Sequence, residues 1–212
     1  MFVLGLTGSI GMGKSETAKM LRAKGVPVFS ADEEVHRQTA KNGPALAAIA
    51  RAFPGTVAGG RLDRQAVAKL VFDETRDPER KNLRKLEAIL HPRVREAERR
   101  FLKAARAARK PAVALDIPLL LEGGDLGRVD AVLVVSAPAP VRAARVLRRP
   151  GMTREKMAAV IAAQMPDALK RRRADYLLPT GLNRRDTLAR LTRLLAQLRP
   201  PRFWRSRKQP HA

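Results

Sequence analysis

Short runs of apolar and β-branched residues alternate along this chain with longer amphipathic segments. Runs of this length and composition are typical of buried strands. Five of them stand out, at residues 2–7, 26–30, 112–117, 131–136 and 174–178. Because helical segments lie between the strands, the order predicts an α/β fold. We expect a mostly parallel sheet with helices on both faces, which makes a three-layer core.

Helical periodicity fills much of the remaining chain, and several of the helices have recognisable ends. The first covers residues 15–25, with Gly25 as its C-terminal cap. Later helices cover 139–149 and 153–165. A last helix begins near Asn183, a residue type that caps helix N-termini. Its leucines recur at helical spacing and predict one buried stripe, Leu188, Leu191, Leu194, Leu195 and Leu198.

The segment 32–110 is almost entirely helical in pattern, so we interpret it as a helical insertion between the second and third strands. Asp63 and Asp77 fit helix N-caps. The small residues at 56–60 indicate a loop. Pro92 falls inside a long helical run, and we expect one helix to end there or another to begin.

Composition narrows the class of protein. Apolar residues make up 45% of the chain, which is enough for a buried core. The chain has no cysteine, which excludes disulfides, thiolate metal sites and a thiol nucleophile and fits a reducing compartment. No apolar run approaches the roughly 18 residues that cross a bilayer, and the N-terminus lacks the basic region of a signal peptide. We therefore expect a cytoplasmic protein without a membrane partner.

The net charge of +23 is large, and most of the excess lies beyond residue 140. A field of this sign attracts polyanions, so nucleic acids and small phosphorylated molecules are both candidate partners. Aromatic residues make up only 4% of the chain, which leaves few platforms for stacking bases. We expect no specific nucleic-acid partner and keep nucleic-acid binding as the less favoured alternative. The sequence indicates no oligomeric state.

The segment Gly8-Ser9-Ile10-Gly11-Met12-Gly13-Lys14-Ser15 matches G-x-x-x-x-G-K-[ST], the P-loop, between an apolar strand and a helix. Glycine allows the backbone to turn its N–H groups around a phosphate, and the helix N-terminus adds a partial positive charge. The lysine of such a loop reaches the β- and γ-phosphates, and the serine hydroxyl binds Mg²⁺. We therefore predict that residues 8–15, together with Glu16, bind ATP with Mg²⁺ as cofactor.

A P-loop alone does not separate a motor, a switch and a kinase. The chain carries no N-K-x-D guanine motif and is short for a motor ATPase. The helical insertion and the basic region near the C-terminus favour a small-molecule kinase. A kinase acting on a nucleoside or a sugar acid is an open alternative at this point.

Six blocks in order resemble the dephospho-CoA kinase family, from residue 3 to about residue 181. The blocks are GLTGSIGMGKSE (5–16), GVPVFSAD (25–32), LHPRV (90–94), DIPLLLEGG (116–124), AAQMP (162–166) and KRRRADYLL (170–178). The resemblance implies transfer of the γ-phosphate of ATP to the ribose 3′-hydroxyl of dephospho-coenzyme A, the last step of coenzyme A biosynthesis.

The resemblance also implies a single P-loop kinase domain over residues 1–198. Its core is expected at 1–31, 111–138 and 174–198, its substrate-binding insertion at 32–110 and a helical lid at 139–173. Residues 199–212 are expected to form a basic disordered tail.

The chain departs from the family pattern at several positions. Ser9, Met12 and Glu16 replace the usual glycine, serine and threonine of the P-loop block. Ser30 replaces the first aspartate of D-A-D, and Pro179-Thr180 replaces the usual D-N after the last strand. The change at Pro179-Thr180 removes the family's usual residues for any adenine or ribose contact from the loop after the last strand.

Asp32 matches the family's second aspartate, at the end of the second strand. There it would accept the proton of the 3′-hydroxyl, and it could also cap the following helix. Lys14 and Asp32 are thus the catalytic candidates. By the same matching, the candidate substrate contacts are Asp32, His91, Pro118, Leu119 and Glu122.

Further charged residues have two possible roles each. Asp116 ends a strand and is either a magnesium partner or a polar strand end. Arg142, Arg145 and Arg149 recur on one helix face, and we expect them to bind ATP phosphates rather than to form a solvated basic face. Residues 170–173 either face phosphate or are surface charge.

Overall fold

The computed structural model describes residues 1–72 and 80–198 in two compact units. Unit 1 contains Met1–Phe29 and the chain from Ala104 onward, and unit 2 is Ser30–Lys103. Unit 2 overlaps most of the segment 32–110 that we expected to be an insertion. The predicted domain boundaries and the substrate-binding role of that insertion stay predictions.

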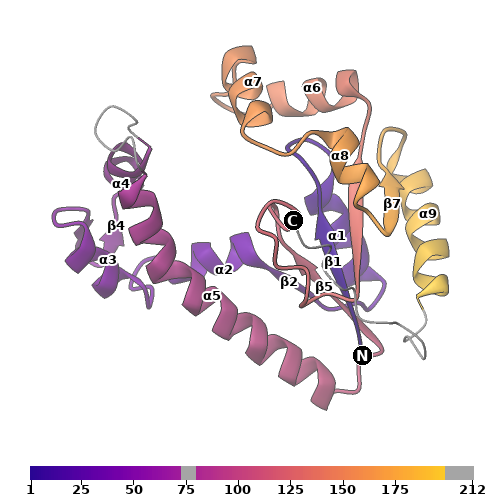
Figure 1. Ribbon diagram of the computed structural model, residues 1–212, viewed down its shortest axis with the longest axis horizontal. Helices are drawn as coiled ribbons and strands as arrows, with labels where there is room; N and C mark the ends of the chain where they lie inside the picture. The colour runs from indigo at the N-terminus through magenta and orange to yellow at the C-terminus, as the bar shows by residue number, and fades with distance from the viewer. Residues whose placement is uncertain (73–79, 199–212) are drawn as a thin grey trace, which may run out of the picture. The chain divides into compact units, whose positions relative to one another are not determined.

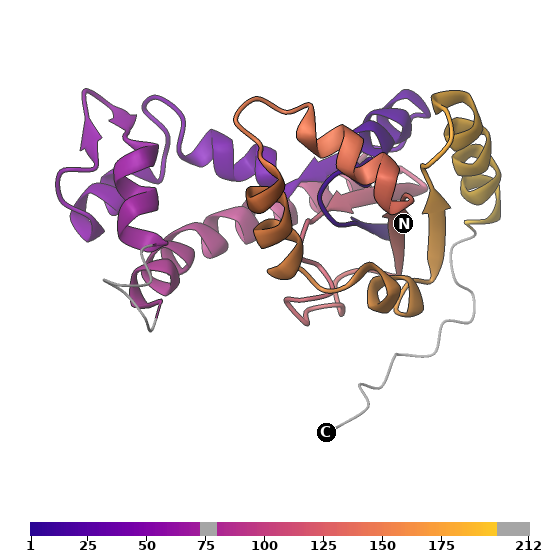
Figure 2. The same cartoon turned by 90° about the horizontal axis from the view of Figure 1, so that it is seen from above.

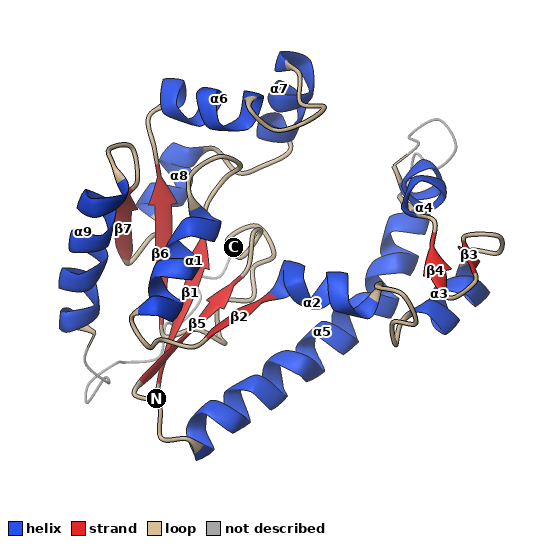
Figure 3. Cartoon of the chain, turned by 180° about the vertical axis from the view of Figure 1, so that it is seen from behind, coloured by secondary structure: helices blue, strands red, loops and turns tan. Residues whose placement is uncertain are grey.

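The main sheet has five strands in the order β2-β5-β1-β6-β7. Figures 1 and 3 show them side by side. β1 pairs in parallel with both β5 and β6, and β6 pairs in parallel with β7. Each strand falls within or beside one of the five predicted runs, which confirms the α/β class. The strands are β1 Phe2–Thr7, β2 Val28–Ser30, β5 Ala112–Asp116, β6 Ala131–Ser136 and β7 Tyr176–Pro179.

The helices of unit 1 are α1 Lys14–Ala23, α6 Ala139–Leu147, α7 Arg154–Ala162, α8 Asp167–Arg172 and α9 Arg184–Gln197. α1 ends as predicted: Gly25 has φ +78°, and the N–H groups of Gly25 and Val26 donate to the carbonyls of Arg22 and Leu21. Asn183 caps α9 through its side chain. α9 packs on β7 at the edge of the sheet (Figure 2).

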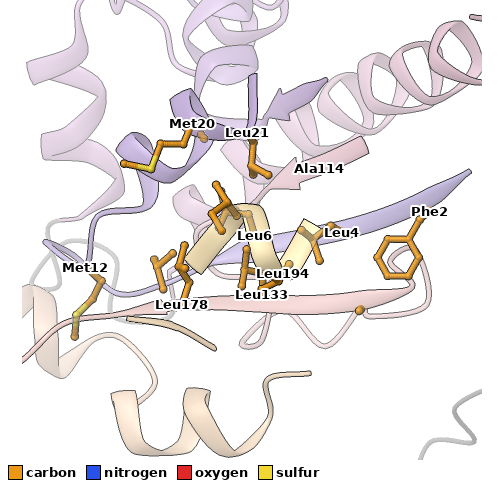
Figure 4. Packing of buried hydrophobic residues seen from close by; sticks show 14 of the residues in the cluster. Phe2, Leu4, Leu6, Met12, Met20, Leu21, Ala114, Leu133, Leu178 and Leu194 are labelled. Carbon is orange, nitrogen blue, oxygen red and sulfur yellow. The ribbon is translucent and has the colours of Figure 1, made fainter. Parts of the chain in front are cut away.

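The core of unit 1 lies between the sheet and the helices α1 and α9 (Figure 4). Leu4 and Leu6, which share one face of β1, are almost fully buried there. The predicted leucine stripe of α9 is confirmed, because Leu191 and Leu194 are buried in the core and the other three leucines are partly buried against it. The opposite face at Gly5 is covered by Leu120 and Val129, which a Cβ at this position would meet.

Unit 2 contains three short helices, part of a long helix and a small hairpin. The helices are α2 Ala31–Gln38, α3 Leu46–Ala52, α4 Arg64–Val71 and α5 Lys81–Ala107. The antiparallel strands β3 Val57–Ala58 and β4 Arg61–Leu62 turn at Gly59 and Gly60. Both glycines have positive φ, as a two-residue hairpin turn requires. The prediction of a plain loop at 56–60 therefore missed the first strand of this hairpin.

The long helix α5 continues through Pro92, so the predicted helix break at this residue is wrong. Proline removes one N–H donor from the helix. The carbonyl that loses its helical donor is that of Ala88, four residues before the proline, and the guanidinium of Arg93 donates to the next carbonyl, that of Ile89, at 2.6 Å. Leu90 and Val94 are buried on either side of Pro92. Tertiary packing thus outweighs the local preference of proline.

Asp63 caps α4 as predicted, since its carboxylate accepts from two N–H groups of the first turn. The predicted cap at Asp77 and the predicted disordered tail at 199–212 lie outside the described residues. Within the described part of the chain, no helix combines the length and the apolar character that crossing a bilayer requires.

Candidate active site

The P-loop, residues 8–15, connects β1 to α1 in unit 1. Gly11 and Gly13 have φ of +75° and +89°, a region that favours glycine. Gly13 is also the N-cap residue of α1, and no side chain accepts a hydrogen bond there. The first N–H groups of a helix have no intrahelical acceptor. The start of α1 is therefore suited to bind an anion such as a phosphate group.

Lys14 forms a short ion pair with Asp116 at the same edge of the sheet. Its Nζ lies 2.6 Å from Asp116 Oδ1, and the two side chains are 15% and 6% exposed. The pair forms because β1 and β5 are neighbouring parallel strands, whose carboxyl ends meet at one edge. The sequence suggested Asp116 as a magnesium partner or as a polar strand end, and neither role included an ion pair with Lys14. Ser15, the next residue of α1, is exposed.

Three contacts fasten the P-loop to distant parts of unit 1. The N–H of Ile10 donates to Gln164 Oε1 at 3.0 Å, in the loop before α8. The sulfur of Met12 accepts from the N–H of Ala137 at 3.1 Å, just after β6. The Thr180 hydroxyl donates to the Met12 carbonyl at 2.7 Å, just after β7. Met12 and Thr180, both departures from the family pattern, thus hold the loop in place.

The arginines of α6 approach the P-loop from one side. Arg145 donates from Nη1 to the Thr180 hydroxyl at 3.1 Å and from Nη2 to the Thr180 carbonyl at 2.6 Å. The backbone of Arg142 lies so close to Gly11 that a Cβ on the glycine would be 3.0 Å from its carbonyl oxygen. Arg149 follows α6 and is exposed. Their predicted phosphate contacts stay predictions.

Glu16 places a carboxylate in the first turn of α1, beside the predicted phosphate site. The side chain lies 2.7 Å from Lys19 Nζ, and this hydrogen bond lowers the pKa of the Glu16 carboxyl. Arg184 lies 3.9 Å from the other carboxylate oxygen. The two cations partly neutralise a charge that would otherwise repel a phosphate group.

Lys170 takes neither of the roles that we considered for residues 170–173. Its side chain is fully buried, and Nζ lies 2.8 Å from Glu122 Oε1. Glu122 Oε1 also accepts the N–H of Met165 at 3.1 Å. The remaining residues of this run, 171–173, are exposed and fit surface charge.

Two of the predicted substrate contacts follow β5. Leu119 is half-exposed, and the carbonyl of Pro118 accepts the Thr7 hydroxyl at 2.8 Å.

Asp32 lies in unit 2, within the first turn of α2 rather than at the end of a strand. Ser30 caps this helix: its hydroxyl accepts the N–H of Glu33 at 3.2 Å. The expectation that Asp32 could be the cap is therefore wrong. Ser30, which replaces an aspartate of the family pattern, takes that role. His91 is exposed on α5.

Asp32 lines a cavity of about 330 Å³ within unit 2. Its wall is mostly apolar and comes from α2, α4 and α5, with Val35, Val67, Leu86 and Leu90 among the lining residues. The Arg64 guanidinium, which can only donate, lies 2.8 Å from His36 Nδ1. No motif marks His36 or Arg64 in the sequence, and only the packing of the two helices α2 and α4 brings them together.

Comparisons with known proteins identify the family. The family model described as dephospho-CoA kinase matches residues 2–184. A dephospho-CoA kinase of Mesorhizobium japonicum is 48% identical over 95% of this chain and 99% of its own length. A dephospho-CoA kinase of Paramagnetospirillum magneticum is 56% identical over 81% of this chain and 78% of its own length.

A solved structure of a Thermus thermophilus protein supports the same fold. Its TM-score is 0.78 at 41% identity, over 94% of this chain and 98% of that protein. The fold is that of the P-loop kinases, with a parallel five-stranded sheet and flanking helices. On the extent of these matches, this chain belongs to the dephospho-CoA kinase family.

Proposed function

We propose that this chain binds Mg²⁺-ATP on residues 8–15 and transfers the γ-phosphoryl group to the ribose 3′-hydroxyl of dephospho-coenzyme A. Family membership makes the chain a dephospho-CoA kinase, the enzyme of the last step of coenzyme A biosynthesis. The proposal that ATP binds on residues 8–15 rests on one observation, the shape of the P-loop with Lys14 paired to Asp116.

The two other functions left open by the sequence are not favoured. The relatives at 48% and 56% identity are both named dephospho-CoA kinase. Neither name indicates a nucleoside kinase, a sugar-acid kinase or a nucleic-acid-binding protein. We place the reaction in the cytoplasm, because a chain without cysteine fits a reducing compartment.

Charge neutralisation is the main contribution proposed for the ATP side. The N–H groups at the start of α1 would bind the phosphate chain, and the ammonium of Lys14 would move from Asp116 toward the β- and γ-phosphates. Arg142, Arg145 and Arg149 would add guanidinium groups, which hydrogen-bond phosphate oxygens in pairs. Fixed positive groups of this kind stabilise the charge that spreads over the transferring phosphoryl group.

Magnesium fits the oxygen groups present at this edge of the sheet. Mg²⁺ in phosphate-transfer sites is bound through one or two protein oxygens together with substrate phosphates. The Ser15 hydroxyl is exposed on α1, and the Asp116 carboxylate lies beside Lys14. We propose Ser15 as the direct ligand and Asp116 as its acidic partner. When bound, the ion supplies further neutralisation of phosphate charge.

Asp32 is the proposed proton acceptor. The 3′-oxygen would form a bond to the γ-phosphorus while the bond to the β–γ bridging oxygen breaks, and ADP leaves. The proton of the hydroxyl passes to the Asp32 carboxylate. The mostly apolar cavity beside Asp32 suits the uncharged arm of dephospho-coenzyme A. His91, Pro118 and Leu119 are proposed as further substrate contacts, whereas Glu122 has the different role argued below.

The test compares wild type with Asp32→Asn and Glu33→Gln. Both variants remove one exposed carboxylate from the first turn of α2, so they form a matched pair. We would measure ADP release with Mg²⁺ and ATP, with and without dephospho-coenzyme A, and identify coenzyme A as the product. We expect substrate-dependent turnover by wild type and Glu33→Gln, and a loss of at least about 100-fold in Asp32→Asn, the lower range for a general base.

Two results would contradict parts of the proposal. Full turnover by Asp32→Asn would keep the kinase and remove Asp32 as the proton acceptor. Absence of coenzyme A from a folded wild-type protein that binds ATP would overturn the proposed acceptor.

A further inference from the structure

Glu122 and Lys170 form an ion pair in the interior of unit 1. Lys170 lies on α8 and its side chain is 0% exposed, while Glu122 follows β5 and its side chain is 21% exposed. The Lys170 ammonium reaches Glu122 Oε1 at ion-pair distance without hydrogen-bond geometry, and Glu122 Oε2 has no hydrogen-bond partner among the described residues. The pair is therefore poorly satisfied on both sides.

A pair of this kind is not explained by stability. The desolvation of two charges often exceeds their attraction, and apolar residues of similar size can replace such a pair without loss. The role of the pair is therefore better sought in the contacts that the two side chains make.

The contacts of Glu122 lead to the P-loop. Besides meeting Lys170, Oε1 accepts the N–H of Met165 at 3.1 Å, in the loop before α8. The preceding residue, Gln164, accepts the N–H of Ile10 with Oε1 at 3.0 Å. One carboxylate oxygen thus fixes α8 and the backbone beside Gln164 at the same time. The position of the Gln164 side chain on the P-loop depends on this backbone.

We propose that Glu122 and Lys170 are positioning residues for nucleotide binding. Lys170 orients the Glu122 carboxylate, the carboxylate holds the Met165 N–H, and Gln164 is thereby kept on Ile10 in the P-loop. Glu122 acts through this chain of contacts and does not touch the substrate. The inference rests on the proposed binding of ATP to residues 8–15.

A matched pair of double variants isolates the Met165 contact. E122Q/K170M and E122M/K170M both remove the two buried charges and keep side chains of similar length. Only the glutamine retains an oxygen that can accept the Met165 N–H. A third variant, Gln164→Met, removes the acceptor of the Ile10 N–H. We would measure the Kd of a non-hydrolysable ATP analogue, the KM for dephospho-coenzyme A and the Tm of each protein.

We expect E122Q/K170M, which loses the orienting Lys170 but keeps an acceptor for the Met165 N–H, to bind the analogue more tightly than E122M/K170M. E122M/K170M and Gln164→Met are expected to bind the ATP analogue about threefold to tenfold more weakly than wild type does. This is the range expected for the loss of one hydrogen bond. A triple variant that combines E122M/K170M with Gln164→Met should bind the analogue no more weakly than Gln164→Met alone. The reason is that both sets of changes interrupt the same series of contacts from Glu122 to Ile10. The Tm of E122M/K170M should lie about 1–6 °C below that of E122Q/K170M, because the Met165 N–H loses its acceptor. If E122M/K170M does not fold, E122L/K170M takes its place, with hydrogen exchange at the Ile10 amide as a second measurement.

Equal affinity of the two double variants for the analogue, or additive losses in the triple variant, would overturn the proposal. So would a raised KM for dephospho-coenzyme A in E122Q/K170M at unchanged analogue affinity, which would make Glu122 a substrate contact. Failure of folded wild type to bind the analogue is a separate result, because it removes the proposed ATP site itself.

Discussion

Replacing Thr180 with valine tests how the P-loop is held. Thr180 is 4% exposed and lies just after β7. Its hydroxyl donates to the Met12 carbonyl at 2.7 Å and accepts from Arg145 Nη1 at 3.1 Å. Valine keeps the shape and the methyl group but can make neither contact. The Met12 carbonyl then loses a buried donor.

The expected loss follows from these two contacts. Leaving a buried polar group unpaired costs about 1–3 kcal/mol. In a chain of this size each kcal/mol lowers the Tm by about 2–4 °C. We expect the Tm of Thr180→Val to fall by about 2–12 °C in thermal unfolding followed by circular dichroism. Affinity for ATP should fall as well, because Met12 belongs to the P-loop.

Thr180→Ser is the control that separates hydrogen bonding from packing. Serine keeps the hydroxyl and loses one methyl group, which costs about 1 kcal/mol. We therefore expect the order wild type, then serine, then valine in both Tm and ATP affinity. A valine variant more stable than the serine variant would refute the reasoning, since it would show that the methyl group and not the hydroxyl holds this loop.

Three further predictions concern other parts of the chain. Gly13→Ala forces a side chain into φ +89°, which costs about 1–2 kcal/mol, and should weaken ATP binding in a direct titration. The hydrogen bond from Arg37 lowers the pKa of Glu34, so this group contributes stability above the ordinary value of 4.5 and loses it at lower pH. Unfolding experiments should show wild type losing stability relative to Glu34→Gln as the pH falls below that value, and parallel curves would contradict this. Asn183→Ala removes the cap on the N–H of Asp186 and should lower the Tm by about 2–4 °C with ATP affinity unchanged.

Local sequence patterns were sufficient to predict the strands of the main sheet, the P-loop and the family. These features depend on local patterns: an apolar run of strand length, a glycine spacing and blocks of consecutive residues. Gly25 and Asn183 were predicted as helix caps for the same reason, since a cap involves only neighbouring residues. The proline at residue 92 shows where a local rule fails, because burial of the flanking residues decides the outcome.

The side chains that meet at the P-loop could not be predicted in this way, because the fold brings them together from distant parts of the chain. Lys14 and Asp116 are 102 positions apart in the sequence, and Ile10 and Gln164 are 154 apart. No local pattern indicates such contacts, because they depend on which strands and loops the fold brings together. The burial of Lys170 is a further case: the three arginines that follow it are exposed, and the packing of α8 on β6 takes the lysine out of water.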